Sequence, residues 1–263
     1  MGALDMNAQS ANQENGLLEF AKSDRGDLSD VEWANQFFLT QIYDERFNPD
    51  GLNIDTESNN CGPASLAMLM SQRGEFSSNF APEVAIDHAR AMMYMDYPDI
   101  DPATLSEEAT LYMKDDLILV DDDTQPVFFE AMTDAPSVAQ GLTSGGANPV
   151  FGSSWAELNK WLQASGAVIA HGYITESWRA QFSDLYGASN SGAVSHFITI
   201  FESTSPEQFI VCDPMHRGGA VLMTRSELGR FFRSPVNVFD STIRIVAWGE
   251  KESEGHQPLE SDE

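Results

Sequence analysis

One cysteine of this sequence stands where a helix should begin, which is a favourable position for a nucleophile. Cys61 is followed by Gly62, by Pro63 and by a run rich in Ala, Leu and Met, a pattern that predicts a helix from Cys61 to Gln72. The unpaired N–H groups and the positive dipole of a first turn stabilise a thiolate, so the pKa of Cys61 should fall. Because Gly62 has no side chain, we expect room for a substrate carbonyl beside the sulfur, with the Cys61 N–H as an oxyanion donor. The alternative is a small buried cysteine that begins a core helix.

A histidine and an aspartate much further along the chain are predicted to face each other on a β-hairpin. His196 lies on one predicted strand, Asp213 ends the next, and residues 203–206 between them have the turn composition Ser-Thr-Ser-Pro. If residue 202 pairs with residue 207, His196 and Asp213 lie directly opposite each other on one face. A carboxylate in that place fixes the imidazole tautomer and stabilises the imidazolium. Together with Cys61 the pair predicts a nucleophilic Cys–His–Asp triad, and a structural His–Asp pair is the alternative.

The remaining titratable candidates have weaker cases. His171, on a predicted strand, is best explained as a core histidine, and His216 has no evident partner. His88 lies on a predicted helix without a second ligand at helical spacing, which argues against a metal site. Residues 121–123 are three aspartates without the ligand pattern of a calcium loop. Cys212 should point away from Asp213 and into the core, and no cofactor or metal is expected.

The elements that must position these residues divide the chain into a helical front half and a back half of strands and helices. In the front half, further helices are expected from Pro82 to about Pro98 and after Pro102. In the back half, Ser154 should cap a helix that stops at Gly166. The predicted strands cover residues 168–174, 197–201, 209–212, 221–224 and 243–248, with a short helix at 226–232. Residues 134–152 are expected to form a loop, so the fold class is α+β.

Length and charge narrow the possible functions. The chain has 263 residues, with 14 Lys and Arg against 41 Asp and Glu, giving a formal charge of −27 that disfavours nucleic acid and anionic membranes. A cationic substrate or partner is compatible with this charge, but a surface that favours solubility or salt tolerance is the simpler explanation. The two cysteines are too few for a disulfide framework. We expect polar, acidic tails at 1–30 and 250–263 around one domain at 31–249.

The motifs around the three candidate residues resemble those of the papain-like cysteine peptidase superfamily. The branch is the one related to double-glycine leader (bacteriocin-processing) peptidases. The resemblance rests on Cys-Gly-Pro-x-Ser-Leu-Ala-Met from Cys61, on His-Phe-Ile-x-Ile from His196 and on Asp-Pro from Asp213, and spans about Phe37 to Trp248. It implies a Cys–His–Asp triad in that chain order. It also implies a two-lobe fold in which a helical lobe with the cysteine packs on an antiparallel sheet lobe with His and Asp, with a cleft between them.

The same resemblance implies a glutamine upstream of the cysteine that donates a hydrogen bond to the oxyanion. Gln41, in Leu-Thr-Gln-Ile-Tyr, is the residue that matches, and Gln36 is the other candidate. The gap from Gln41 to Cys61 is longer than in the family pattern. In addition, Ser195 stands before the histidine where such proteins often have glycine.

The expected function is therefore a cysteine hydrolase that cleaves a peptide or amide bond through a thioester acyl-enzyme. Three alternatives stay open: an acyltransferase or transpeptidase, a secreted amidase or protease effector toxin, and a catalytically inactive binding module. No segment has the length and hydrophobicity of a membrane span, and the N-terminus lacks the pattern of a signal peptide. We expect a soluble protein that is cytoplasmic or exported without a cleaved N-terminal signal.

Overall fold

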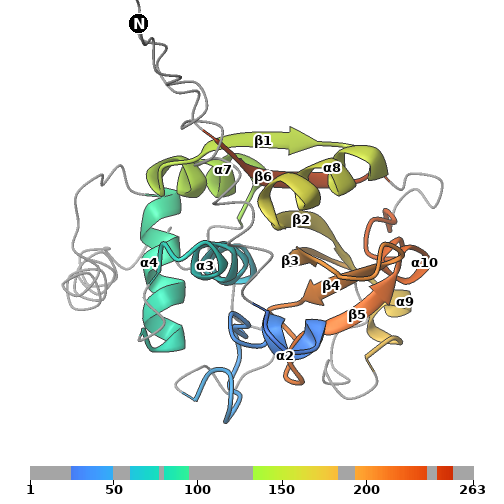
Figure 1. The fold of residues 1–263 in the computed structure, drawn as a ribbon, viewed down its shortest axis with the longest axis horizontal. Coiled ribbons are helices and arrows are strands. Elements are labelled where there is room, and N and C mark those ends of the chain that lie inside the picture. The colour runs from blue at the N-terminus through green and yellow to red at the C-terminus, as the bar shows by residue number, and fades with distance from the viewer. Residues whose placement is uncertain are drawn as a thin grey trace, which may run out of the picture.

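An antiparallel sheet forms the centre of the computed structural model, which describes residues 25–49, 60–76, 80–94, 133–182, 193–235 and 242–250 (Figure 1). The six strands lie in the order β1-β6-β2-β3-β4-β5, and each neighbouring pair is antiparallel. Their bounds are β1 Asn148–Gly152, β2 Ala167–Ile174, β3 Val194–Glu202, β4 Gln208–Cys212, β5 Val221–Thr224 and β6 Arg244–Gly249. Helices and an antiparallel sheet together make the α+β class that the sequence predicts.

Helices cover both faces of this sheet (Figure 1). The described helices are α2 Asp30–Ala34, α3 Cys61–Gln72, α4 Pro82–Tyr94, α7 Ala135–Ser144, α8 Trp155–Ser165, α9 Glu176–Arg179 and α10 Arg225–Leu228. One core contains apolar residues of α2, α3, α4 and α7, and a second core contains those of α8 and α10 together with Trp178 of α9. The sheet therefore separates two apolar cores.

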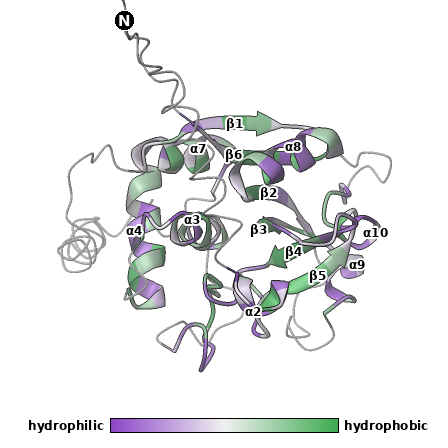
Figure 2. Cartoon of the chain, in the orientation of Figure 1, coloured by the Kyte–Doolittle hydropathy of each residue, from purple (hydrophilic) through white to green (hydrophobic). Residues whose placement is uncertain are grey.

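Strand alternation explains why both faces are buried. On β2, Ala167 and Ile169 belong to the core beside α3, whereas Val168 and Ala170 belong to the core beside α8. The central strands are accordingly apolar along most of their length, while α4 and α8 carry polar residues as well as apolar ones (Figure 2). Residues from Gly62 to Met70 of α3 are all buried, so this helix lies deep against the sheet.

Several predicted elements are confirmed with close boundaries. The helix from Cys61 to Gln72 is α3. In α8, the Ser154 side chain accepts a hydrogen bond from the Glu157 N–H, and Gly166 ends the helix with a left-handed φ of 76°. The strands predicted in the back half correspond to β2, β3, β4, β5 and β6, and the predicted helix at 226–232 is the shorter α10.

The predicted loop at 134–152 is wrong, because it contains α7 and β1. Asp134 caps α7 by accepting from the Ser137 N–H, and Val138 and Leu142 lie one turn apart on its buried face. The glycines at 145 and 146 only end this helix. Pro149 is accommodated because β1 is an edge strand that pairs with β6 alone.

Some predictions fall outside the described residues. These are the end of the second helix near Pro98, the helix after Pro102, the aspartates at 121–123, most of the first tail and nearly all of the second. Arg25 to Asp30, on the tail side of the predicted boundary, pack against the end of β3. Within the described segments, no helix has both the length and the hydrophobicity to cross a membrane.

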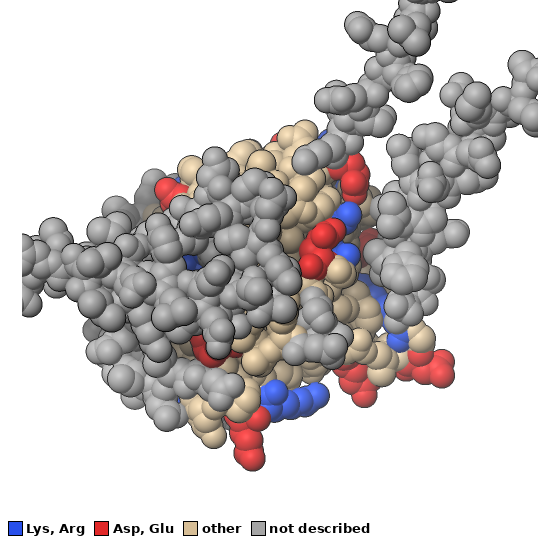
Figure 3. Space-filling view, turned by 90° about the vertical axis from the view of Figure 1, so that its left-hand side faces the viewer, with Lys and Arg blue, Asp and Glu red and all other residues tan. Residues whose placement is uncertain are grey.

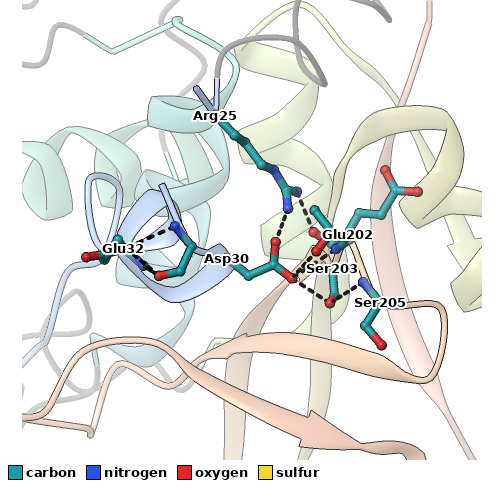
Figure 4. Close-up of polar contacts among 8 residues, drawn as sticks. Arg25, Asp30, Glu32, Glu202, Ser203 and Ser205 are labelled. Carbon is teal, nitrogen blue, oxygen red and sulfur yellow. Dashed lines mark hydrogen bonds and ion pairs between the residues drawn. The ribbon is translucent and has the colours of Figure 1, made fainter. Parts of the chain in front are cut away.

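The hairpin of β3 and β4 has a different register from the predicted one. Glu202 pairs with Phe209 instead of residue 207, and the ladder ends where Thr199 pairs with Cys212. The turn is longer because Asp30 organises it: its Oδ2 accepts from the Ser203 hydroxyl at 2.6 Å and from the Thr204 N–H at 2.9 Å (Figure 4). A shift of two residues preserves the face on which each side chain lies.

A short N-terminal segment holds this turn in place. Arg25 donates from Nη1 to Asp30 Oδ1 and from Nη2 to the Glu202 carbonyl, both at 2.5 Å (Figure 4). Its guanidinium also stacks over the Trp33 ring, with Cζ 4.1 Å from the ring centroid. The start of the described chain is thus bound to the hairpin that carries His196 and Asp213.

Candidate active site

Cys61 is the first residue of α3 and is a partly exposed residue. The backbone N–H groups of Gly62 and Phe197 donate hydrogen bonds to its sulfur, and so does the His196 side chain. The sulfur therefore lies between the start of a helix and the edge of a strand, surrounded by donors that favour its ionised form.

The early end of β4 makes this contact possible. β4 pairs with β3 only between Thr199 and Glu202, so the N-terminal half of β3 faces α3 rather than a strand on that side. The Phe197 N–H, which a longer β4 would occupy, is thereby left to the sulfur. Thr199 anchors the helix at the same edge, because its hydroxyl donates to the Ser65 carbonyl at 2.8 Å.

His196 and Asp213 form a buried pair, with side chains exposed by only 3% and 1%. His196 Nε2 lies 2.6 Å from Asp213 Oδ1, so the predicted contact exists. The predicted geometry behind it is wrong: with the observed register, Asp213 follows β4 as a diagonal neighbour of His196 rather than its direct partner. The contact survives because the two side chains still share one face of the sheet and reach across the diagonal.

Trp178 is a residue of the site that the sequence analysis missed. Its indole Nε1–H donates to Asp213 Oδ2 at 3.0 Å, and the Met215 N–H donates to Oδ1 at 2.9 Å. Trp178 lies in α9, the four-residue helix that follows β2 and begins with the side-chain cap of Thr175. A tryptophan just after a short cap is the only sequence signal, and it does not indicate which carboxylate the indole will meet.

Aromatic packing confines the His196 ring. Phe231 lies edge-on to it, with ring centroids 6.2 Å apart, and Trp178 packs on Phe231 at 4.9 Å. Gly172, the partner of His196 on β2, permits this approach, since a Cβ there would lie 2.4 Å from the Phe231 carbonyl oxygen. The imidazole is therefore held between β2, the turn after α10 and Asp213.

The electrostatics of the site favour a charged pair. Burial alone would lower the pKa of His196, but the Asp213 charge and hydrogen bond and the interactions with Cys61 raise it to about 10. Burial alone would raise the pKa of the Cys61 thiol, but the hydrogen bond and charge of His196 and the two backbone N–H groups lower it below its usual value. Both shifts favour a thiolate beside an imidazolium.

Gln41 lies close to the same end of the sheet. It is buried, and its backbone N–H donates to the Pro214 carbonyl at 2.8 Å, one residue beyond Asp213. The Thr40 hydroxyl donates to the same carbonyl at 2.7 Å. These bonds fix the backbone of Gln41 beside the His–Asp pair, while its role as an oxyanion donor stays a prediction. Gln36, the other candidate, is exposed.

The space beside Gly62 is not open for a substrate as predicted. A Cβ at Gly62 would lie 2.2 Å from Thr133 Cγ2 and 2.5 Å from Thr133 Oγ1. The glycine is needed because the chain entering α7 packs against the start of α3. Any substrate carbonyl must therefore approach the sulfur from another side.

The other three histidines among the described residues have structural surroundings. His171 Nε2 shares a hydrogen bond of 2.7 Å with Ser195 Oγ, and His88 stacks on Phe76 at 4.6 Å. The prediction that His216 has no partner is wrong, since its Nδ1 contacts the Gly219 carbonyl. Among the residues that the structure describes, no group of three or more His, Cys, Asp or Glu side chains could hold a metal ion.

Cys212 differs from Cys61 in every respect that controls reactivity. It is fully buried in the core beside α3, and burial, followed by the nearby Asp213 charge, raises the pKa of its thiol.

On the face shown in Figure 3, the acidic and basic side chains of the visible described residues lie interspersed rather than in one patch. Neither a family model nor a curated protein sequence matches this chain.

Proposed function

We propose that this protein is a cysteine hydrolase of the papain-like type that cleaves a peptide or amide bond. The observation that carries the proposal is the hydrogen-bonded series from Cys61 through His196 to Asp213, which joins a helix start, a strand and the end of the next strand. A helical lobe bearing the nucleophile and a sheet lobe bearing the His–Asp pair are part of the same proposal.

In the proposed mechanism, Cys61 rests as a thiolate beside protonated His196. Because Nε2 of the ring bonds Asp213, Nδ1 is the nitrogen that faces the sulfur. The thiolate attacks the substrate carbonyl, and the Cys61 N–H and the Gln41 carboxamide hold the developing oxyanion. His196 gives its proton to the leaving amine, which departs and leaves a thioester. The histidine then takes a proton from water, the hydroxide attacks the thioester, and the acid product leaves as the thiolate re-forms.

The surroundings of Asp213 support its role in this mechanism. Its two oxygens accept from different groups, so the carboxylate is fixed in position opposite the imidazole. A carboxylate in that place favours the imidazolium that each half of the reaction requires. His196 therefore keeps its proton until the leaving amine takes it.

The first experiment measures alkylation of the two cysteines by iodoacetamide, followed by mass spectrometry. Cys61 should react at pH 6, well below the usual thiol pKa of 9.0, whereas Cys212 should stay unmodified in the folded protein. His196→Ala should lower the rate at Cys61 at this pH by about tenfold or more, since it removes the charge that stabilises the thiolate. The matched control is His88→Phe, which replaces a histidine stacked on aromatic rings and should leave the rate unchanged.

A Cys61 that reacts at pH 6 no faster than a cysteine in an unstructured peptide would refute the proposal. Cleavage itself is tested with a peptide library, with Cys61→Ala as the inactive reference. Comparing cationic with neutral peptides tests whether the charge of −27 selects substrates. Adding a free amine shows whether the acyl group passes to water, as proposed, or to an amine acceptor.

A further inference from the structure

Helix α3 covers only part of the sheet face against which it packs. Its last turn lies at the start of β2, because a Cβ at Gly166 would meet Gln72 Nε2 at 3.2 Å. Nearer its beginning, the Ser65 carbonyl accepts from Thr199 of β3 at 2.8 Å. The start of α3, at Cys61, is therefore directed toward the end of β2 and the start of β3.

The sheet continues beyond this helix start with four half-buried residues. The rise per residue of helix and strand places Cys61 at about the level of His171. Earlier residues of β2 on this face belong to the core beside α3, whereas His171 and Tyr173 are only half-buried. Tyr173 pairs with Ser195 of β3, and His171 pairs with Arg244 of β6, so all four side chains share one face. We call these four residues the Arg244 cluster.

The Arg244 cluster is joined to the strand that carries the proposed base. His171 Nε2 shares a hydrogen bond of 2.7 Å with Ser195 Oγ, and its ring centroid lies 5.9 Å from that of Tyr173. The His171 ring also packs on Phe197, the residue after His196, with centroids 4.9 Å apart. The cluster therefore lies beside the triad, on the side of β3 that faces β2.

The charge of the cluster is opposite to that of the whole chain. Among the described residues, no carboxylate forms an ion pair with Arg244, and no group bonds the Tyr173 hydroxyl. Burial, the Arg244 charge and the His196 charge all lower the pKa of His171, and no acidic group opposes them. In a chain with 41 acidic residues, a half-buried arginine without a carboxylate is a site where one from outside can bind.

A carboxylate matches the donors that are present. A guanidinium presents two parallel N–H groups that fit the two oxygens of a carboxylate, and hydroxyl groups beside it add further donors. We propose that Arg244, together with Tyr173 and Ser195, binds a carboxylate of the substrate. Strands lie about 4.8 Å apart, so Arg244, two strands from β3, reaches a group next to the cleaved bond rather than the bond itself.

This inference rests on the proposed function and deepens it by naming the class of substrate. The substrate is a peptide or amide with a carboxylate close to the cleaved bond, either at its C-terminus or on an acidic side chain. The formal charge of −27 repels such a substrate in general, so the attraction has to come from the cluster itself.

The test uses pairs of reagents that alkylate Cys61 and differ in charge. N-iodoacetylglycine and N-iodoacetylglycinamide represent a terminal carboxylate and its neutral form. The α-amides of N-iodoacetylaspartic acid and N-iodoacetylasparagine do the same for a side-chain carboxylate. Mass spectrometry gives the rate ratio of charged to neutral reagent for each pair. Both reagents attack one sulfur, so any change in the thiolate fraction cancels from the ratio.

The ratio should exceed one in the wild type for at least one pair, and that pair identifies the source of the carboxylate. Arg244→Gln should lower the ratio by about fivefold to tenfold, the effect of one hydrogen bond between charged groups at a partly exposed site. Arg244→Lys, which keeps the charge without the fork, should show a smaller fall. The matched control is Arg225→Gln, which changes the net charge equally but lies on α10, beside Trp155 of the opposite face, and should leave the ratio unchanged.

Three results would overturn the inference: a wild-type ratio below one for both pairs, an equal ratio in wild type and Arg244→Gln, or an equal fall in Arg225→Gln. The proposed function fails separately, if Cys61 reacts at pH 6 no faster than a peptide thiol. The ratio can still be measured at pH 9 in that case. Near-UV circular dichroism checks folding. If Arg244→Gln does not fold, Tyr173→Phe takes its place, and the loss of one hydroxyl should lower the ratio by about twofold to threefold.

Discussion

The carboxylate of Asp213 is held on both of its oxygen atoms. Oδ1 accepts from the His196 ring and from the Met215 N–H, and Oδ2 accepts from Trp178. This arrangement keeps a negative charge beside the imidazole in a place where neither side chain reaches water. The raised pKa of His196 is the consequence, and it couples the charge of the site to the stability of the fold.

This coupling predicts how stability depends on pH once the thiol is removed. In Cys61→Ala, His196 should still be held protonated by Asp213, with a folded pKa above its unfolded value of 6.5 but below about 10. The stabilisation is then complete below pH 6.5 and is lost as pH rises through the folded pKa. The free energy of unfolding in urea should fall by on the order of 2 kcal/mol between pH 6 and pH 10.

The control for this measurement is Cys61→Ala combined with Asp213→Asn. The asparagine cannot raise the pKa of His196, so this part of the alkaline loss should disappear. Equal pH dependence in the two variants would contradict the assigned role of Asp213.

A second prediction concerns the contact between Gly62 and Thr133. Gly62→Ala should lower the free energy of unfolding by about 1–3 kcal/mol, because the new methyl overlaps Thr133 and forces the two segments apart. Thr133→Gly in the same protein should recover most of this loss beyond its own effect, as measured by urea unfolding. Additive effects of the two changes would show that the contact is not responsible.

The catalytic candidates could be predicted from the sequence because their residue types and their order along the chain are enough to identify them. His196 and Asp213 stay together despite the wrong register, since an error of two residues does not change the face of a strand. Trp178 and Thr133 could not be predicted. Their contacts with Asp213 and Gly62 depend on how distant segments pack, which no local pattern encodes.

At the scale of elements, the hairpin of β3 and β4 depends on α2. Asp30 bonds both the turn and Arg25, and Arg25 bonds the last carbonyl of β3 (Figure 4). Burial alone would raise the pKa of Asp30, but Ser203, Thr204 and Arg25 lower it below its usual value. The contribution of this carboxylate is therefore present above pH 4 and is lost as pH falls through its folded pKa.

Replacing Asp30 by asparagine should consequently weaken the hairpin without touching the triad. We expect a loss of about 1–3 kcal/mol in the free energy of unfolding at pH 7, and a smaller difference from wild type below pH 4. The matched control is Asp27→Asn, an exposed aspartate three residues away. A loss in Asp30→Asn that is equal at pH 7 and pH 3 would contradict the pH argument.

Elements with clear ends were the ones that the sequence could predict. Ser154 and Gly166 delimit α8, and the cysteine motif delimits the start of α3. The helical spacing of apolar residues in α7 is weak because small residues and glycines interrupt it. Which of its residues are buried depends on contacts with α3 and α4. β1 carries a proline that argues against a strand until its place at the sheet edge is known.

For the molecule as a whole, the two main catalytic candidates belong to different cores. Cys61 packs against the core beside α3, whereas the His196 ring contacts Phe231 of the core on the opposite face. The site exists only where both cores are assembled around β3. The apolar sequences of the strands predict that the sheet is buried on both faces. They do not predict which helix covers which face.

Because the site depends on both cores, the fast alkylation of Cys61 and the folded structure should be lost together. With increasing urea at pH 6, fast alkylation of Cys61, far-UV circular dichroism and tryptophan fluorescence should follow one transition, as expected if neither core persists alone. Cys212 should become reactive over the same range at pH 9. Loss of fast Cys61 alkylation at a clearly lower urea concentration than the loss of helix would show that one core opens first.

The contrast between the two cysteines also has a consequence for oxidative damage. A thiolate is the form that peroxide converts to sulfenic acid. Cys61, a partly exposed residue with a lowered thiol pKa, should therefore be oxidised before the buried Cys212, whose thiol pKa is raised. Aerobic storage should therefore add oxygen to Cys61 and spare Cys212. Because Cys212 lies in the interior, it offers no accessible partner for trapping the sulfenic acid as a disulfide within the chain. The protein would depend on small-molecule thiols in its surroundings to restore the reduced sulfur.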